Sequence, residues 1–254
     1  MPTDPDGLTQ PWLVSLQQQR VIAVIRVSEL ELGLQLAQVA ADAGLRLIEI
    51  TWNSDRPTHL IPRLRDRLPN CWIGAGTLLS RADLQAAIAV GAQFCFTPHT
   101  DPALIAAAVA QNVPIIPGAL SPTEIVTAWQ AGASSVKVFP IQAVGGASYL
   151  RRLQGPLGHI PLIPTGGVTC ANARDLIEAG AIAVGLSRDL FPTDWVQAGN
   201  WEAIVTHIQQ FHQHLRHSVR FNEVRLNRDG KPGNDGTEEG THNHLKGGMA
   251  QEFN

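Results

Sequence analysis

Short apolar runs alternate with amphipathic stretches between about residue 21 and residue 187. Each run is apolar nearly throughout, which is typical of parallel strands that are buried on both faces. Eight of these runs are predicted to be strands: 21–27, 47–51, 72–77, 94–98, 113–118, 135–140, 161–167 and 181–187. The pattern therefore predicts eight β/α units in one chain.

The amphipathic stretches carry signals that begin and end helices. Ser28-x-x-Glu31 and Ser121-x-x-Glu124 have the spacing of a capping box. Four helices are expected to end at a glycine just before the next strand: Gly44, Gly91, Gly132 and Gly180. Eight units of even size favour a TIM (β/α)8 barrel. A doubly wound open sheet is less favoured, because no G-x-G-x-x-G motif follows the first strand.

The two ends of the chain differ from this repeating part. Residues 1–19 are predicted to contain one short amphipathic helix, 12–19, that closes the bottom of the barrel, and the barrel itself is expected over residues 20–217. Residues 218–254 are rich in Gly, Asn, Asp and Glu with almost nothing to bury. This polar tail is predicted to be disordered.

Composition argues against several classes of function. A formal net charge of -3 offers no clustered basic surface for nucleic acid or an anionic membrane. No basic region followed by an apolar segment opens the chain, and no uncharged run is long enough to span a bilayer, so a cytoplasmic protein is expected.

Metal and disulfide chemistry are not expected either. The three cysteines, Cys71, Cys95 and Cys170, form no C-x-x-C pair and are interpreted as small buried hydrophobes. The histidines between 212 and 217 and between 242 and 244 are interpreted as solvated surface, because no carboxylate or cysteine lies at ligand spacing. No cofactor is predicted.

A single lysine lies inside a predicted strand. Lys137 has Val136 and Val138 as neighbours, whereas the other two lysines, Lys231 and Lys246, lie in the polar tail. A lysine on a sheet usually extends its amine to solvent. Apolar neighbours, however, lower the amine pKa, and a neutral amine can attack a ketone to form a Schiff base, which an arginine cannot do. Lys137 is therefore the candidate nucleophile.

Glu49 is the corresponding carboxylate in the second predicted strand. It lies between Ile48 and Ile50, where a buried carboxylate is costly without a partner or a task. One interpretation is a salt bridge to Arg26 or Arg46. The favoured interpretation is a general acid/base whose pKa is raised toward neutrality by its apolar neighbours.

The ends of the other strands supply candidate binding residues, because a TIM barrel carries its site on the C-terminal ends of the strands and the loops that follow. Gly166-Gly167 ends the seventh strand and Ser187 ends the eighth, where backbone N–H groups often hold a phosphate. A simple tight turn is the alternative for the glycine pair. The remaining candidate substrate-binding residues are Arg26, Asn53, Thr77, Pro98 and Phe139.

Four short motifs now carry a resemblance to a family. GAGT (74–77), IIPG (115–118), KVFP (137–140) and PTGGV (164–168), together with a glutamate in the second strand, make residues 21–190 similar to the 2-keto-3-deoxy-6-phosphogluconate / 4-hydroxy-2-oxoglutarate aldolase family. The resemblance implies a class I aldolase on a TIM barrel, a homotrimer that needs no metal.

The resemblance also implies a reaction and a role for each matching residue. The expected activity is cleavage of 2-dehydro-3-deoxy-6-phosphogluconate to pyruvate and glyceraldehyde 3-phosphate, with 4-hydroxy-2-oxoglutarate, which gives pyruvate and glyoxylate, as a second substrate. Lys137 would form the Schiff base, Glu49 would be the acid/base and Thr77 would contact the pyruvyl portion. The substrate phosphate would be held by Gly166, Gly167 and Ser187.

One position departs from the family pattern. Many members carry an arginine two residues after the threonine of the second strand, where this chain has Asn53. The asparagine-serine run at this point resembles the branch that acts on the galactonate epimer, so 2-dehydro-3-deoxy-6-phosphogalactonate is the alternative substrate. The hypothesis is that Arg26, at the end of the first strand, supplies the charge for the substrate carboxylate.

Two other classes of function stay open. A phosphate-binding barrel isomerase or epimerase would use the same loops after the seventh and eighth strands but would not need an imine-forming lysine. A sugar-phosphate-binding protein without catalytic activity is the other alternative.

Overall fold

The computed structural model describes residues 6–217 of the 254-residue chain, so the predicted disordered tail lies outside the described residues. The strands in this part are β1 (Val21–Ile25), β2 (Leu47–Thr51), β3 (Trp72–Gly76), β4 (Cys95–Phe96), β5 (Ile115–Ile116), β6 (Gly118–Ala119), β7 (Val136–Val138), β8 (Leu162–Pro164) and β9 (Val184–Leu186). A strand lies in every run for which one was predicted. The run 113–118 contains β5 and the first residue of β6, which ends one residue beyond the run at Ala119; Pro117, which has no N–H for the ladder, lies between the two strands.

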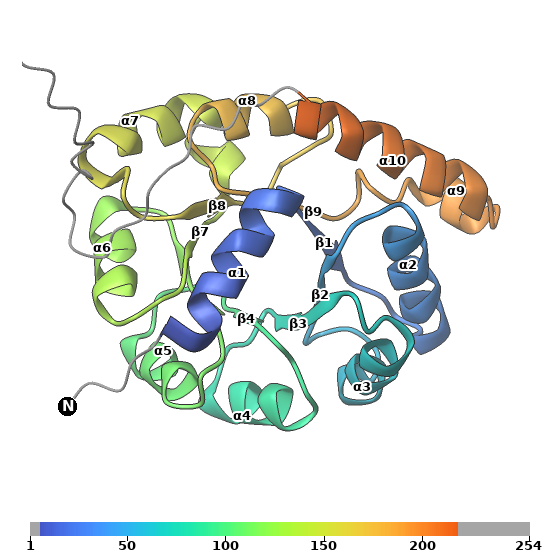
Figure 1. The fold of residues 1–254 in the computed structure, drawn as a ribbon, viewed down its shortest axis with the longest axis horizontal. Coiled ribbons are helices and arrows are strands. Elements are labelled where there is room, and N and C mark those ends of the chain that lie inside the picture. The colour runs from blue at the N-terminus through green and yellow to red at the C-terminus, as the bar shows by residue number, and fades with distance from the viewer. Residues whose placement is uncertain (1–5, 218–254) are drawn as a thin grey trace, which may run out of the picture. The chain divides into compact units, whose positions relative to one another are not determined.

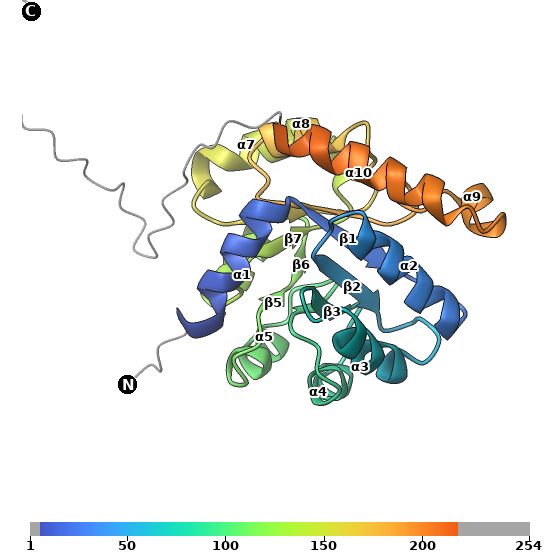
Figure 2. The same cartoon turned by 45° about the vertical axis from the view of Figure 1, so that its right-hand side comes forward.

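Helices follow the strands in alternation. They are α1 (Asp6–Gln19), α2 (Leu30–Asp42), α3 (Pro57–Arg67), α4 (Arg81–Ala89), α5 (Pro102–Val109), α6 (Pro122–Gln130), the 3₁₀ helix η1 (Ile141–Val144), α7 (Ala147–Leu157), α8 (Ala173–Glu178), α9 (Thr193–Gln197) and α10 (Trp201–His217). Figure 2 shows α2, α3, α4 and α5 on the outer side of a curled set of strands. The fold is therefore of the α/β class.

All strand pairs are parallel and form two sheets. Their orders are β5-β4-β3-β2-β1-β9 and β6-β7-β8. The two sheets adjoin at two places. At the first, Pro117 alone separates β5 of one sheet from β6 of the other. At the other, the Ile182 N–H, just before β9, donates to the Leu162 carbonyl of β8 at 3.0 Å. The C-terminal ends of all strands consequently point to the same side.

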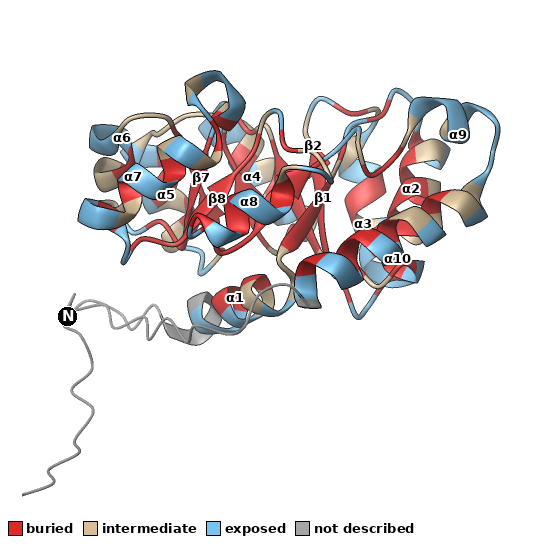
Figure 3. Cartoon of the chain, turned by 90° about the horizontal axis from the view of Figure 1, so that it is seen from above, coloured by how far each residue is buried: buried red, intermediate tan, exposed pale blue. Residues whose placement is uncertain are grey.

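The strands are buried on both faces, as their continuous apolar sequences predict. All five residues of β2 are buried, including Glu49. In Figure 3 the strands are red, whereas the helices turn pale blue faces outward. A charged side chain in such a strand can point only into the interior or toward an end of the strands.

Helix α1 covers the N-terminal ends of the strands, where it crosses them in Figure 1. The fully buried Trp12 donates from Nε1 to Ser135 Oγ at 3.3 Å, just before β7. Its ring centre lies 4.7 Å from that of Phe94 and 5.9 Å from that of Trp72. The predicted N-terminal helix is present, but its predicted start at residue 12 is wrong, because the helix begins at Asp6.

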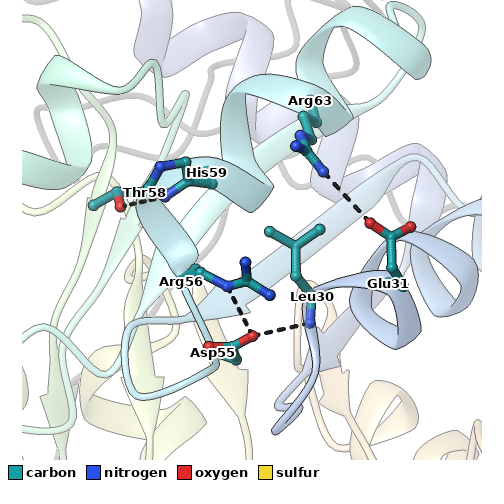
Figure 4. Close-up of polar contacts among 7 residues, drawn as sticks. All are labelled: Leu30, Glu31, Asp55, Arg56, Thr58, His59 and Arg63. Atoms are coloured by element: carbon teal, nitrogen blue, oxygen red, sulfur yellow. Dashed lines mark hydrogen bonds and ion pairs between the residues drawn. The ribbon is translucent and has the colours of Figure 1, made fainter.

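The predicted capping box at Ser28 is also wrong. Helix α2 has Glu29 as its N-cap, and no side chain of that residue caps it. Instead the Leu30 N–H donates to Asp55 Oδ2 at 3.2 Å, and Arg56 Nε reaches the same oxygen at 3.0 Å (Figure 4). The cap therefore comes from the loop between β2 and α3, which no local spacing reveals.

The other local signals are confirmed. Ser121 Oγ accepts from the Glu124 N–H at 3.3 Å, and Glu124 Oε2 accepts from the Ser121 N–H at 2.7 Å, which completes a capping box. Positive φ values, between 92° and 102°, occur at the four predicted helix-ending glycines, Gly44, Gly91, Gly132 and Gly180. Such a backbone conformation favours glycine.

The interpretation of the histidines needs correction at one position. His212 on α10 is buried, and its Nε2 lies 2.9 Å from the Gln19 carbonyl, so it joins α10 to the end of α1. Burial lowers the pKa of this imidazole. His242 and His244 lie outside the described residues.

The cysteine prediction holds for Cys71 and Cys95, which are buried, whereas Cys170 is half-buried. Residues 6–217 contain no group of three or more His, Cys, Asp or Glu side chains arranged to hold a metal ion. None of the helices between these bounds combines the length and the apolarity needed to cross a membrane.

Candidate active site

A cavity of about 970 Å³ opens at the C-terminal ends of the strands, on the side opposite to α1. Of the ten predicted site residues, eight line it: Arg26, Glu49, Thr77, Lys137, Phe139, Gly166, Gly167 and Ser187. Asn53 does not line the cavity and is exposed. Pro98 does not line it either, and its backbone packs against Gly118 of β6.

Lys137 is buried in the middle of β7 with only 8% of its surface exposed. Its Nζ lies 4.7 Å from the centre of the Phe139 ring and 5.9 Å from that of Phe96. Burial lowers the pKa of the amine; the negative charge of Glu49 opposes this shift, and the positive charge of Arg26 adds to it. The net direction favours the neutral, nucleophilic amine.

Glu49 is even more buried, with 2% exposure. Burial raises the pKa of its carboxyl, against the opposing effects of Lys137 and Arg26. The predicted alternative of a salt bridge is wrong, because no ion pair within residues 6–217 involves Glu49. The Arg46 guanidinium donates instead to the Ala41 carbonyl at 2.7 Å.

Gly76 makes room for the Glu49 carboxylate. A Cβ at this glycine, which ends β3, would lie 1.7 Å from Glu49 Oε1 and 2.4 Å from its Cδ. No real Cβ approaches a carboxylate so closely, so any larger residue would displace the side chain of Glu49. The glycine of the GAGT motif therefore fixes where this carboxylate can lie.

Arg26 is held at the rim of the cavity by hydroxyl groups. Its Nε donates to Thr51 Oγ1 at 3.4 Å and its Nη2 donates to Thr77 Oγ1 at 3.5 Å. Thr51 is in turn hydrogen-bonded to Ser54 Oγ at 3.1 Å, and Ser54 accepts from the Val27 N–H at 3.3 Å. Because neither threonine neutralises the guanidinium, Arg26 keeps its charge available for an anion.

The Gly166-Gly167 loop presents bare backbone to the cavity. Both residues have positive φ, 80° and 84°. A Cβ at Gly166 would lie 2.8 Å from the Phe139 ring, and one at Gly167 would lie 2.4 Å from Gln142 Cβ. The loop is thus a tight turn that packs closely against Phe139 and Gln142, so each position requires glycine.

Several residues that line the cavity were not among the predicted site residues, and three of them bear on ligand binding: Thr165, Arg188 and Asp189. The hydroxyl of Thr165 is buried and has no hydrogen-bond partner within the described part of the chain, although the residue lines the cavity. A buried polar atom without a partner is costly unless a ligand satisfies it. Arg188 and Asp189 follow Ser187 along the same wall. Their only sequence signal is their place after the last strand.

A model of the KDPG and KHG aldolase family matches residues 14–207. The chain belongs to this family. The 2-dehydro-3-deoxy-phosphogluconate aldolase of Haemophilus influenzae is 32% identical over 196 residues, which are 77% of this chain and 92% of that protein.

Two solved structures place this aldolase family on the same fold. The KDPG aldolase of Legionella pneumophila, with pyruvate captured as a covalent carbinolamine intermediate, is 26% identical, with a TM-score of 0.73 over 83% of this chain and 99% of that chain. A structure named native KDPGal is 30% identical, with a TM-score of 0.71 over 78% and 95% of the two chains.

Proposed function

We propose that this chain is a class I aldolase that cleaves 2-dehydro-3-deoxy-6-phosphogluconate to pyruvate and glyceraldehyde 3-phosphate, and 4-hydroxy-2-oxoglutarate to pyruvate and glyoxylate. The observation that carries the proposal is a buried lysine of lowered pKa and a buried carboxyl of raised pKa in one cavity. Measuring pyruvate release from each substrate by the purified protein tests it. Release from neither substrate would reject the proposal.

The chemistry begins at Lys137. Its neutral amine adds to the C2 ketone, and Glu49, as a neutral carboxylic acid, supplies the proton with which the carbinolamine hydroxyl leaves as water. The protonated imine that results is an electron sink. Glu49, now a carboxylate, takes the proton of the C4 hydroxyl, directly or through a water.

Cleavage of the bond between C3 and C4 follows. Its electron pair moves into the imine to give an enamine, and the aldehyde leaves. Glu49 then returns the proton to C3. Water hydrolyses the protonated imine to free pyruvate and Lys137, and Glu49 takes the proton that the water releases. A carboxyl that exchanges a proton in both directions needs a pKa near the working pH, and the raised pKa of Glu49 fits this need.

Binding of the substrate follows from the charges around the reacting carbon. Arg26 holds the carboxylate next to C2, with Thr77 beside it. The unpartnered Thr165 hydroxyl supplies a hydrogen bond to the substrate. The Gly166-Gly167 backbone and Ser187 hold the phosphate at the other end.

Replacing Arg26 with glutamine is expected to raise the KM for the keto acid substrates roughly 10- to 100-fold, because the charged hydrogen bond to the substrate carboxylate is lost. The kcat should change less, because Arg26 contacts no reacting atom. Steady-state kinetics of Arg26→Gln beside Arg67→Gln, a change on exposed α3, measures both parameters. An unchanged KM in Arg26→Gln would mean that another group binds the carboxylate.

Replacing Gly76 with alanine is expected to lower kcat about 10²-fold, because the new Cβ displaces Glu49 by an ångström or more. The matched control is Gly155→Ala on α7, where a Cβ has nothing within 4 Å. Kinetics of both variants, with thermal unfolding to confirm that each is folded, makes the comparison. Equal kcat values would show that the position of the carboxylate does not matter.

Architecture completes the proposal. The junctions at Pro117 and between Ile182 and Leu162 support closure of the two sheets into one eight-unit (β/α)8 barrel over residues 20–217, with α1 at its bottom. The proposed assembly is a homotrimer, and the likeness to a designed protein cage built from symmetric oligomeric domains supports oligomerisation. We also place the enzyme in the cytoplasm, where its free cysteines would stay reduced.

The galactonate epimer is the alternative substrate. It is supported by the similarity to native KDPGal and by the asparagine-serine run at residues 53 and 54. Comparing kcat/KM for 2-dehydro-3-deoxy-6-phosphogluconate and 2-dehydro-3-deoxy-6-phosphogalactonate distinguishes the two, since the epimers differ at a single carbon.

A further inference from the structure

Arg188 lines the cavity with a positive charge that has no protein partner within residues 6–217. It follows Ser187 at the end of β9 and lines the same cavity as Lys137. Within residues 6–217 no carboxylate lies within ion-pair distance of its guanidinium, and no protein group accepts a hydrogen bond from it. A cation without a protein partner on a cavity wall is available to an anionic ligand.

The neighbouring carboxylate does not neutralise this charge. Asp189 Oδ2 accepts a hydrogen bond from the Cys170 N–H, so its side chain turns to the loop after β8. The Asp189 carbonyl lies 2.9 Å from His207 Nε2, which fixes the backbone from α10. Asp189 thus joins the loop that carries Arg188 to the loop that carries Gly166 and Gly167.

The two arginines of the cavity make different contacts. Arg26 donates to Thr51 and Thr77, on the side of β2 and β3. Arg188 follows β9, which pairs with β1, and its loop is bonded through Asp189 to the loop after β8 that carries Gly166 and Gly167. A substrate with a carboxylate and a second anion matches these two positive charges.

We propose that Arg188 binds the terminal phosphate of the sugar acid and so determines the preference for phosphorylated over unphosphorylated substrates. This inference rests on the proposed function of the same cavity. Backbone N–H groups and one serine hydroxyl can hold a phosphate, but a guanidinium adds a full charge and two parallel donors. The discrimination between phosphorylated and unphosphorylated sugar acids therefore depends on the Arg188 side chain.

The test compares 2-dehydro-3-deoxy-6-phosphogluconate with the same sugar acid without its phosphate. In Arg188→Gln the ratio of the two kcat/KM values is expected to fall roughly 10- to 100-fold, because a charge-assisted contact is lost only for the phosphorylated substrate. Arg188→Lys should give an intermediate ratio, since it keeps the charge and loses the paired donors. Arg151→Gln, at an exposed position of α7, is the matched control and should keep the wild-type ratio.

A wild-type ratio in Arg188→Gln would overturn the inference, whether both substrates are turned over normally or both are slowed equally. Inhibition by inorganic phosphate gives a second readout, and the inhibition constant should rise by a similar factor in Arg188→Gln. Failure of the proposed function gives a different result from failure of this inference. If the proposed function is wrong, the wild-type protein releases no pyruvate from either substrate. If only the inference is wrong, the wild-type protein still releases pyruvate.

Discussion

Replacing Lys137 with arginine is expected to lower the kcat of aldol cleavage by roughly 10⁴-fold or more, the scale on which enzymes lose activity when their nucleophile is removed. Arginine keeps a positive charge and a similar length but stays protonated, so it cannot add to a ketone. The loss should appear with every substrate, because each reaction passes through the same imine. Pyruvate release over a wide range of enzyme concentration measures it.

The chain offers a matched control for this change. Lys231→Arg makes the same substitution outside the described residues and is expected to leave kcat unaltered. Thermal unfolding of Lys137→Arg separates lost chemistry from lost folding, since the larger guanidinium must fit a site with 8% exposure. A folded Lys137→Arg enzyme within tenfold of wild type would show that no imine forms at this residue.

Replacing Glu49 with glutamine is expected to lower kcat about 10²- to 10⁴-fold, the usual contribution of a general acid/base. Glutamine keeps the shape of the side chain beside Gly76 but neither gives nor takes a proton. Because the Glu49 charge raises the pKa of Lys137, its removal lowers that pKa further and favours the neutral amine. The lysine should therefore still react with pyruvate while later proton transfers fail.

Proton exchange at the pyruvate methyl group separates these steps. In deuterated water, wild type should exchange the methyl protons through the enamine, and Glu49→Gln should exchange them far more slowly, as nuclear magnetic resonance would record. Glu31→Gln, at an exposed position of α2, is the control. Exchange at the wild-type rate in Glu49→Gln would assign the proton transfer to another group, and Glu49 would then have only a structural role.

Sequence patterns predicted those parts of the fold that depend on neighbours in the chain. Apolar runs, helix-ending glycines and the Ser121 capping box are local, and the structure has them where they were expected. The cap of α2 was missed because it comes from Asp55, on a different loop. His212 was misjudged because only tertiary packing brings α10 against Gln19.

The same contrast holds for the site. Lys137 and Glu49 were predicted from the sequence, because a buried charge within a continuous apolar strand is costly unless it has a partner or a function. Thr165 and Arg188 were not, since a threonine or an arginine in a loop is ordinary until a cavity is seen beside it. Asn53 was selected for its position after β2, but the chain turns there and leaves it exposed.

Capture of the imine tests the central claim most directly. Wild-type protein is incubated with pyruvate and sodium borohydride, and the intact mass and the peptide masses are measured. The proposed mechanism predicts one reduced pyruvyl adduct per chain, on the peptide that contains Lys137, and none without pyruvate. No adduct, or an adduct on a peptide without Lys137, would contradict it.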